Sequence, residues 1–433
     1  MRNDPKIIKA WCMYDWANSV YSLIITSSIF PAYYQAVTKN PDNGDRINFL
    51  GFEIVNSVLY SYSLSFAFLC VVFLSPLLAG IADHIGRKKL FMKLFCYLGS
   101  FACMGLYFFT GDNLGWGITM LILATIGYAG SLVFYNAFLP EITTPETSDK
   151  VSARGFSFGY IGSVILLLIN LSMILKPEFY GGISSGTASR ISFLMVGIWW
   201  LGFAQYTFWL LPERKTPKIT ERHFITSGFY ELKNVLDQIK NMKSLKRFLL
   251  AFFFCSMGVQ TVMYVATLFG EKEFHLETGQ LITVVLILQL IAIPGANFAA
   301  FVSRKKGNIF TLTCIVTLWI LVCLFAYFIQ NGNQFYMLAV LVGLVMGAIQ
   351  AMTRSTYSKL LPQGTEDNAS FFSFYDVTEK LAIVIGTFSY GLIENLTGSM
   401  RNSILALGLF FVIGLYFFYI TRKSLKNETS GTY

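Results

Sequence analysis

Apolar residues form long runs along the whole chain, and short polar segments separate these runs. A membrane-spanning helix needs about 20 mostly apolar residues, and twelve segments approach or exceed that length. They are residues 9–37, 55–81, 89–110, 114–139, 152–175, 189–211, 246–269, 278–302, 308–330, 334–360, 368–393 and 402–421. The seventh, tenth and eleventh are less cleanly apolar than the others. The pattern predicts an all-α integral membrane protein with twelve transmembrane helices in a lipid bilayer.

The longest polar segment divides the predicted spans into two sets of six. It begins PERKTPKITERH and continues as an amphipathic pattern, FYELKNVLDQIKNM. The halves share a weak internal repeat, because each has Leu-Pro, an acidic loop and then Phe-Ser-Phe, at 156–158 and at 372–374. We expect an N-terminal six-helix bundle (1–211), a cytoplasmic linker (212–245) and a pseudo-symmetric C-terminal six-helix bundle with a short tail (246–433).

The distribution of Lys and Arg predicts the orientation of the spans. With a cytoplasmic N-terminus, the segments on the cytoplasmic side hold 25 of these residues and those on the opposite side hold six. The remaining two of the 33, Arg354 and Lys380, lie inside spans. Because positive residues concentrate on the cytoplasmic side, we expect both termini in the cytoplasm and the protein in the cell (inner) membrane. The net charge of +9 then reflects topology, and we expect no nucleic-acid partner.

Composition narrows the class of protein further. Hydrophobic residues make up 55% of the chain and charged residues 13%, whereas a soluble domain has about 25% charged residues. The seven cysteines and three histidines show no CxxC or Cys/His spacing, so we expect no metal and no other cofactor. No histidine lies in a predicted span and no GxxxxGK(S/T) motif is present. These absences argue against an intramembrane hydrolase and against ATP hydrolysis, and we expect a protein that is not an enzyme.

Five charged residues lie deep inside predicted spans, away from the basic residues at the span ends, and a charge near the bilayer centre costs about 2.5–3.5 kcal/mol. They are Asp15, Arg354, Asp376, Glu379 and Lys380. Helical spacing places Asn18 on the same stripe as Asp15, and Gln350 on the same stripe as Arg354. Polar stripes on apolar helices point inward. We therefore expect these seven residues to be the candidates for substrate binding or coupling, around a water-filled cavity between the bundles.

Depth along the helices separates the roles of these residues. Asp15 and Arg354 each lie about six residues from the cytoplasmic end of a span, roughly 9 Å inside, which indicates an inner gate or lower cavity. Lys380 lies near the middle of its span, four residues from Asp376, and the two can pair. An alternative stays open: these charges form buried ion pairs that fix helix packing, and Asp15 bonds to backbone near the start of the first helix.

The segment between the second and third spans, GIADHIGRKKLF, forms a short basic turn. Gly80 lets helices approach closely, Gly86 permits the turn, and Arg87 and Lys88 anchor it to the inner surface. The pattern G-x-x-x-D-x-x-G-R-K/R-K/R resembles the signature of the major facilitator superfamily. This resemblance implies the major facilitator fold, a monomer, and a conformational latch made of Gly80, Asp83, Gly86, Arg87 and Lys88. In that latch, Asp83 would bond the inner ends of neighbouring helices in the outward-open state.

The second half contains a related segment, FAAFVSRKKGN. It keeps the cations and a glycine but has Ser303 where an Asp is expected, an asymmetry that is common in the superfamily. The simpler interpretation of both segments also stays open: each is a positively charged cytoplasmic loop with a convenient glycine.

Residues of the first span narrow the resemblance. Residues 14–19 read YDWANS, which is similar to the signature of the autophagy-related vacuolar amino-acid effluxers and their bacterial relatives. The segments NAFLPE (136–141), GYIG (159–162) and Arg354-Ser355 also resemble that group. The resemblance implies amino acids or similar small zwitterions as substrates.

Together these patterns predict a secondary active transporter that moves a small solute, an amino acid or similar zwitterion, by alternating access. A proton gradient is a natural energy source, with Asp376 or Glu379 as the carboxylate that binds and releases the proton. Two alternatives remain. One is a proton-coupled exporter of amphipathic compounds, which the many Phe and Met residues favour. The other is a non-transporting receptor or membrane enzyme on the same scaffold.

Overall fold

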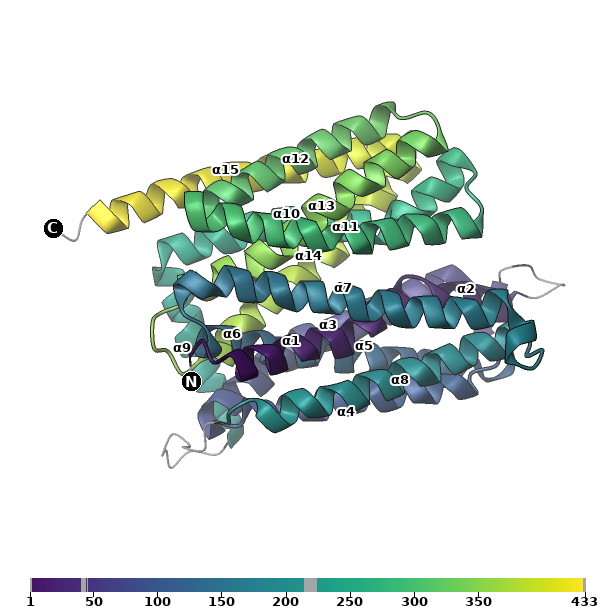
Figure 1. The fold of residues 1–433 in the computed structure, drawn as a ribbon, viewed down its shortest axis with the longest axis horizontal. Coiled ribbons are helices and arrows are strands. Elements are labelled where there is room, and N and C mark those ends of the chain that lie inside the picture. The colour runs from purple at the N-terminus through teal and green to yellow at the C-terminus, as the bar shows by residue number, and fades with distance from the viewer. Residues whose placement is uncertain (1, 40–43, 45, 214–223, 431–433) are drawn as a thin grey trace.

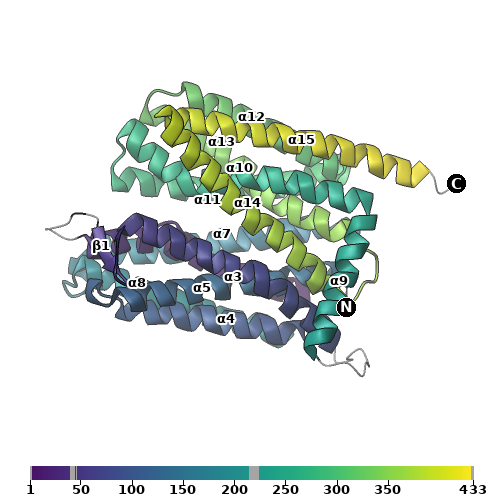
Figure 2. The same ribbon diagram turned by 180° about the vertical axis from the view of Figure 1, so that it is seen from behind.

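The computed structural model describes residues 2–39, 44, 46–213 and 224–430. Long α-helices pack side by side along the longest axis of the molecule (Figure 1). Helices of the first half (purple to teal) lie together, and most helices of the second half (green to yellow) lie beside them as a second group. The view from behind shows the same division (Figure 2). Residues 214–223 of the expected linker lie outside the described residues.

The first half is built from seven longer helices and several short elements. The longer helices are α1 Pro5–Val20, α2 Ile29–Thr38, α3 Asn56–Ile85, α4 Lys88–Gly105, α5 Leu114–Ala137, α7 Pro145–Leu175 and α8 Ser185–Leu210. The short elements are η1 Tyr21–Thr26 (a π-helix), β1 Arg46–Phe49, β2 Phe52–Val55, η2 Leu106–Phe108, η3 Gly111–Asn113, α6 Leu139–Ile142 and η4 Pro177–Tyr180.

The strands β1 and β2 are a small departure from the all-α prediction. They pair antiparallel, with Phe49 opposite Phe52. Leu50 and Gly51 form the two-residue turn, and both have positive φ (53° and 85°). Such turns match the twist of the paired strands, so a hairpin closes in the segment before α3.

The second half is built from seven helices in chain order. They are α9 Phe224–Asn241, α10 Lys243–Phe274, α11 Thr278–Lys306, α12 Asn308–Phe328, α13 Gly332–Leu360, α14 Asn368–Thr397 and α15 Met400–Ser430. α9 occupies the described part of the expected linker and contacts α3.

Ten helices of the described chain are long and apolar enough to cross a membrane. They coincide with ten of the twelve expected spans. The first expected span, 9–37, is divided among α1, η1 and α2. The eleventh coincides with α14, which carries Asp376, Glu379 and Lys380. For these two segments the membrane crossing stays a prediction.

The first span is interrupted next to the space between the bundles. After the π-helical turn η1, Ser27 and Ser28 leave the helical pattern before α2 begins. The Ser27 hydroxyl donates to the Ser22 carbonyl at 2.9 Å, and the Ser28 hydroxyl donates to the Leu23 carbonyl at 2.6 Å. These hydroxyls satisfy carbonyls that the interruption frees, which is how broken helices are tolerated in membranes.

Both termini lie at the same end of the molecule (Figure 1). The turns 85–88 and 306–308, which join α3 to α4 and α11 to α12, lie at this end too. Gly86 ends α3 in the left-handed conformation (φ 70°), as the sequence predicts. We call this end the basic end, because Arg87, Lys88 and residues 304–306 gather there. Its assignment to the cytoplasm stays a prediction.

Candidate functional site

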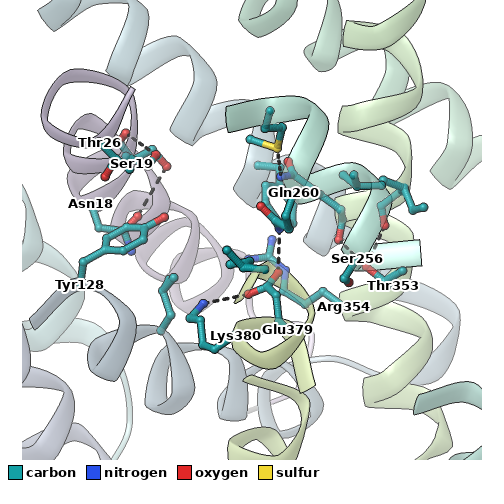
Figure 3. A pocket seen from close by; sticks show the side chains of 18 of the residues that line it. Asn18, Ser19, Thr26, Tyr128, Ser256, Gln260, Thr353, Arg354, Glu379 and Lys380 are labelled. Carbon is teal, nitrogen blue, oxygen red and sulfur yellow. Dashed lines mark hydrogen bonds and ion pairs between the residues drawn. The ribbon is translucent and has the colours of Figure 1, made fainter. Parts of the chain in front are cut away.

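A central cavity of about 190 Å³ lies between the two halves. Figure 3 shows its walls, with Asn18, Ser19, Thr26 and Tyr128 on one side and the second-half residues on the other. One water takes about 30 Å³ in the liquid, so the cavity has room for several. Six of the seven candidate residues line it: Asp15, Asn18, Gln350, Arg354, Glu379 and Lys380. The structure therefore places these residues around a chamber between the bundles, as expected.

Asp376 is the candidate that the structure places differently. It does not line the cavity and is only 4% exposed. Side chains on a helix lean toward its N-terminus, so Lys380 covers the turn that holds Asp376. The Lys380 ammonium lies 3.2 Å from Asp376 Oδ1, the i, i+4 pair that the spacing predicts.

An ion pair at one end of the cavity joins the two halves. Arg354 Nη1 on α13 lies 3.2 Å from Asp15 Oδ2 on α1. The same Asp15 oxygen accepts a hydrogen bond from the Tyr135 hydroxyl at 2.7 Å. Asp15 is thus held by side chains of two other helices. The interpretation that it merely bonds to backbone near the helix start is wrong.

The Arg354 guanidinium is fully engaged by the protein. Nε donates to Ser152 Oγ at 3.0 Å, and Nη2 donates to the Ser152 carbonyl at 2.8 Å. Its plane also lies against aromatic rings, 4.0 Å from the Phe156 centroid and 4.7 Å from that of Trp11. Each guanidinium nitrogen of Arg354 thus has a partner in the first half, and the side chain links α13 to α1 and α7.

Gly155 makes room for this pair. A Cβ at residue 155 would lie 2.9 Å from Arg354 Nη2 and from the Trp11 ring, closer than side chains approach one another. A larger residue would therefore displace the guanidinium or its neighbours.

The residues around the Arg354–Asp15 pair separate the central cavity from a second hollow. This hollow, of about 570 Å³, lies at the basic end and is lined by Asp83, Lys88, Ser148 and Ser358, among others. On α7, residue 148 faces the second hollow and residue 156 the cavity, and Ser152 lies between them. The Ser152 hydroxyl also donates to the Ala351 carbonyl at 2.8 Å. A layer one to two helical turns thick thus lies between the two spaces.

A second charged group lies on the α14 wall of the cavity. The Lys380 ammonium is 2.9 Å from Glu379 Oε2 as well as close to Asp376, so one cation serves two carboxylates. Gln260 Nε2 donates to Glu379 Oε1 at 3.1 Å, as Figure 3 shows. Among the described residues, the second oxygen of Asp376, Oδ2, is buried and has no hydrogen-bond partner. With every group ionised, this triad carries one excess negative charge.

The opposite wall, from the first half, is neutral and polar. It includes Asn18, Ser19, Ser22, Thr26 and Tyr128. The Asn18 amide nitrogen is buried and donates to no group within the described part of the chain. The Glu379 carboxylate on one wall thus faces polar residues with hydroxyl groups on the other.

Asp83 makes a hydrogen-bonded contact with a helix of the other half, and its role in a conformational latch stays a prediction. Its carboxylate oxygens accept from the backbone N–H groups of Ala369 (3.2 Å) and Ser370 (2.7 Å), in the first turn of α14. Helix N-termini bind anions through such free N–H groups. Gly80 is buried within α3, and Arg87 is exposed at the turn.

Lys88 corrects one expectation about this turn. The sequence analysis placed its charge at the inner surface, but Lys88 is only 8% exposed. Its ammonium pairs with Glu141 and lies 3.6 Å from Asp83. Glu141 also accepts from the Asn368 amide at 2.9 Å. A buried cation surrounded by carboxylates strengthens the contact between halves instead of anchoring a loop.

The related turn of the second half also makes a contact between the halves. There the carboxylate is not supplied by the turn itself but by the first half. Asp149 of α7 accepts from Ser303 Oγ at 2.6 Å, from Asn308 Nδ2 at 2.8 Å and from Lys359 Nζ at 2.7 Å. Ser303 occupies the place where an Asp was expected, and the first half supplies the missing carboxylate. Sequence analysis missed Asp149, although it lies in the acidic loop ETSDK that precedes the fifth span.

Hydrogen bonds between described residues of the two halves gather toward the basic end. The hydrogen bond farthest from that end runs from the Tyr160 hydroxyl to Gln350 Oε1. Beyond it, toward the opposite end, we find no hydrogen bond between described residues of the two halves. The bundles are therefore closed at the basic end and not hydrogen-bonded to each other at the other.

Comparison with known sequences identifies relatives along the whole chain. The family model described as "Vacuole effluxer Atg22 like" matches residues 3–429. YxiO of Bacillus subtilis, an MFS-type transporter, is 30% identical over 99% of this chain and 98% of its own length. Autophagy-related protein 22 of Chaetomium globosum is 24% identical over 92% of this chain and 76% of its own length.

Solved structures share the fold at low sequence identity. The major facilitator superfamily transporter FucP superposes with a TM-score of 0.72 at 14% identity, over 96% of this chain and 98% of its own. The human organic anion transporter MFSD10 gives a TM-score of 0.74 at 12% identity, over 96% and 100% of the two chains. These relatives and neighbours are transporters rather than enzymes. The chain therefore belongs to the Atg22-like vacuole effluxer family, and it is a multi-pass membrane transporter with the major facilitator fold.

Proposed function

We propose that this protein moves a small zwitterion, such as an amino acid, across the cell membrane by alternating access. The basic end faces the cytoplasm in this proposal, in keeping with the excess of Lys and Arg there. The central cavity is the solute site, and the layer around Arg354 and Asp15 is the closed cytoplasmic gate. A single chain contains both bundles and the site between them, so we propose a functional monomer.

The charge arrangement of the cavity supports a zwitterion most directly. Glu379 faces the cavity and belongs to a triad with one carboxylate in excess, which suits a solute ammonium group. Across the cavity, the hydroxyl groups of Ser19, Ser22 and Thr26 suit a carboxylate. The description of the family as vacuole effluxers, which this chain's sequence matches, is consistent with a small-solute cargo.

The same excess charge supports coupling to protons. A proton on Glu379 or Asp376 and an ammonium group beside Glu379 would each neutralise the triad. Binding of one then disfavours binding of the other, because both compete for the same negative charge. Competition of this kind links the movement of solute to that of protons in opposite directions.

Transport by purified protein tests this proposal. Proteoliposomes would be assayed with labelled amino acids, sugars and dipeptides, with and without an imposed pH difference. We expect saturable flux of one or more amino acids that the pH difference changes, and no flux of sugars. Sugar flux without amino-acid flux would overturn the proposed substrate class.

A second candidate is export of amphipathic cations, because aromatic residues form a large part of the cavity wall. Phe68, Phe156, Phe252 and Tyr264 all line it. A hydrophobic cation would place its charge at Glu379 without needing the Asn18 wall. Competition separates the two candidates: amino acids block transport of a zwitterion, whereas only hydrophobic cations block the exporter.

A further inference from the structure

A hollow lined by cations lies on the flank of the second bundle at the basic end. It has a volume of about 590 Å³ and lies between the first turns of α10 and the last turns of α15. Lys243 and Arg247 line it from α10, and Lys423 lines it from α15. It shares no lining residue with the central cavity, so it is a separate site.

The three cations of this hollow have no acidic partner in the described part of the chain. Neither Lys243, Arg247 nor Lys423 forms an ion pair there, and no carboxylate lines the hollow. Buried cations at the same end behave differently, since Lys88 pairs with Glu141 and Lys359 with Asp149. Within the described residues, a positive concavity made by two helices therefore has no counter-charge.

Two exposed tyrosines of the hollow are of the kind found at the level of lipid headgroups. Tyr416 and Tyr419 complete its wall and are 60% and 66% exposed, on a helix that is apolar enough to cross the membrane. Exposed tyrosines gather at the membrane–water interface. Tyr416, Tyr419 and Lys423 follow one stripe of α15, and the rise from Tyr416 to Lys423 is about 10 Å. The stripe thus leads from the edge of the apolar belt to the basic end.

We propose that this hollow binds the headgroup of an anionic glycerophospholipid. Its phosphate would lie among Lys243, Arg247 and Lys423, and the tyrosine rings would pack beside the glycerol and the first acyl carbons. Arg recognises phosphate through paired N–H groups, and basic pockets between transmembrane helices on the cytoplasmic side bind anionic headgroups. Basic residues that only set the orientation of a helix in the membrane need to lie at the helix end. Here, two helices direct their basic side chains into one concavity.

Lipid binding to the purified full-length protein tests the proposal. Native mass spectrometry would compare phosphatidylglycerol with phosphatidylcholine for the wild type and for a Lys243→Gln/Arg247→Gln/Lys423→Gln variant. The matched control is Arg304→Gln/Lys305→Gln/Lys306→Gln, which removes three exposed cations from the same end. We expect the wild type to bind phosphatidylglycerol at least tenfold more tightly than phosphatidylcholine. The first variant should lose that preference, and the control should keep it within twofold.

Three results would overturn the assignment. They are an unchanged preference in the hollow variant, an equal loss in the control, and complete displacement of phosphatidylglycerol by 10 mM inorganic phosphate, which would indicate a site for free phosphate. The single substitution Lys423→Gln, at an exposed position, provides a variant with little risk to folding. It should weaken phosphatidylglycerol binding several-fold, and no weakening would also contradict the proposal.

Discussion

Arg354 and Asp15 form a buried ion pair, 3.2 Å between Nη1 and Oδ2, that joins α13 of the second half to α1 of the first. The residues are 339 positions apart in the sequence. The pair lies in the layer between the central cavity and the hollow at the basic end. A path from the cavity to that end can open only if the two residues separate. We therefore infer that this pair is part of the gate at the basic end.

We predict that Asp15→Asn and Arg354→Ala each abolish transport while the protein still reaches the membrane. Removing one partner of a buried ion pair leaves an uncompensated charge, at a cost of about 3–5 kcal/mol. Flux into proteoliposomes and the thermal unfolding midpoint measure both effects. Asp237→Asn is the control, because it breaks the exposed Lys240–Asp237 pair and should change neither. Normal flux in both gate variants would assign the pair to packing alone.

Gly155→Ala should impair transport because it disturbs the same Arg354–Asp15 pair. The added methyl would lie 2.9 Å from Arg354 Nη2, so the guanidinium must move. We expect flux to fall at least tenfold, and the unfolding midpoint to drop. Gly202→Ala on α8 is the matched control, because a Cβ there meets no atom within 4 Å. If Gly155→Ala behaved like Gly202→Ala, the close packing around the pair would have no role in transport.

Glu379→Gln should raise the KM for an amino-acid substrate at least tenfold, because it removes the carboxylate that faces the cavity. Glu379→Asp should restore part of the affinity, since it keeps the charge. Initial rates over a range of substrate concentrations give KM and kcat separately. A KM within twofold of wild type for Glu379→Gln would exclude Glu379 as the ammonium site.

Asp83→Asn and Asp149→Asn should each loosen the closed basic end. Each removes a carboxylate that accepts hydrogen bonds from the other half. Spin labels at the exposed residues Arg87 and Lys305, one in each half, report the opening as a distance between them. We expect each variant to populate longer distances than the wild type, and the double variant to do so most. Unchanged distances in the double variant would show that other contacts hold the end closed.

Sequence periodicity predicts most of the helices because each apolar run has the length of a membrane span. The expected span 55–81 begins one residue before α3, Asn56–Ile85, and ends inside it, and 308–330 nearly matches α12, Asn308–Phe328. Asp15 and Arg354 were identifiable as candidates because charges are rare in such runs. Their pairing was not, because the packing of α1 against α7 and α13 decides which stripes meet.

Other features of the site depend on tertiary contacts that no local pattern shows. Lys88 looks like a surface anchor in sequence, but Glu141 and Asp83 bury it. Asp149 was missed because a carboxylate in an acidic loop normally faces water, and only the approach of Ser303 and Lys359 gives it partners. The sequence shows no periodic signal of the π-helical interruption after Val20. The serines beside it do not mark it either, because serines are common in membrane helices.

Thiol labelling from each side of the membrane tests the central claim most directly. In a background whose native cysteines are replaced, Ser22→Cys lies in the cavity wall and Ser358→Cys lies in the hollow at the basic end. We expect an impermeant reagent to label Ser22→Cys from the side opposite the basic end, with saturating substrate protecting it. The same reagent should reach Ser358→Cys only from the basic end. Labelling of Ser22→Cys from the basic end alone, or from neither side, would contradict a gated chamber between the bundles.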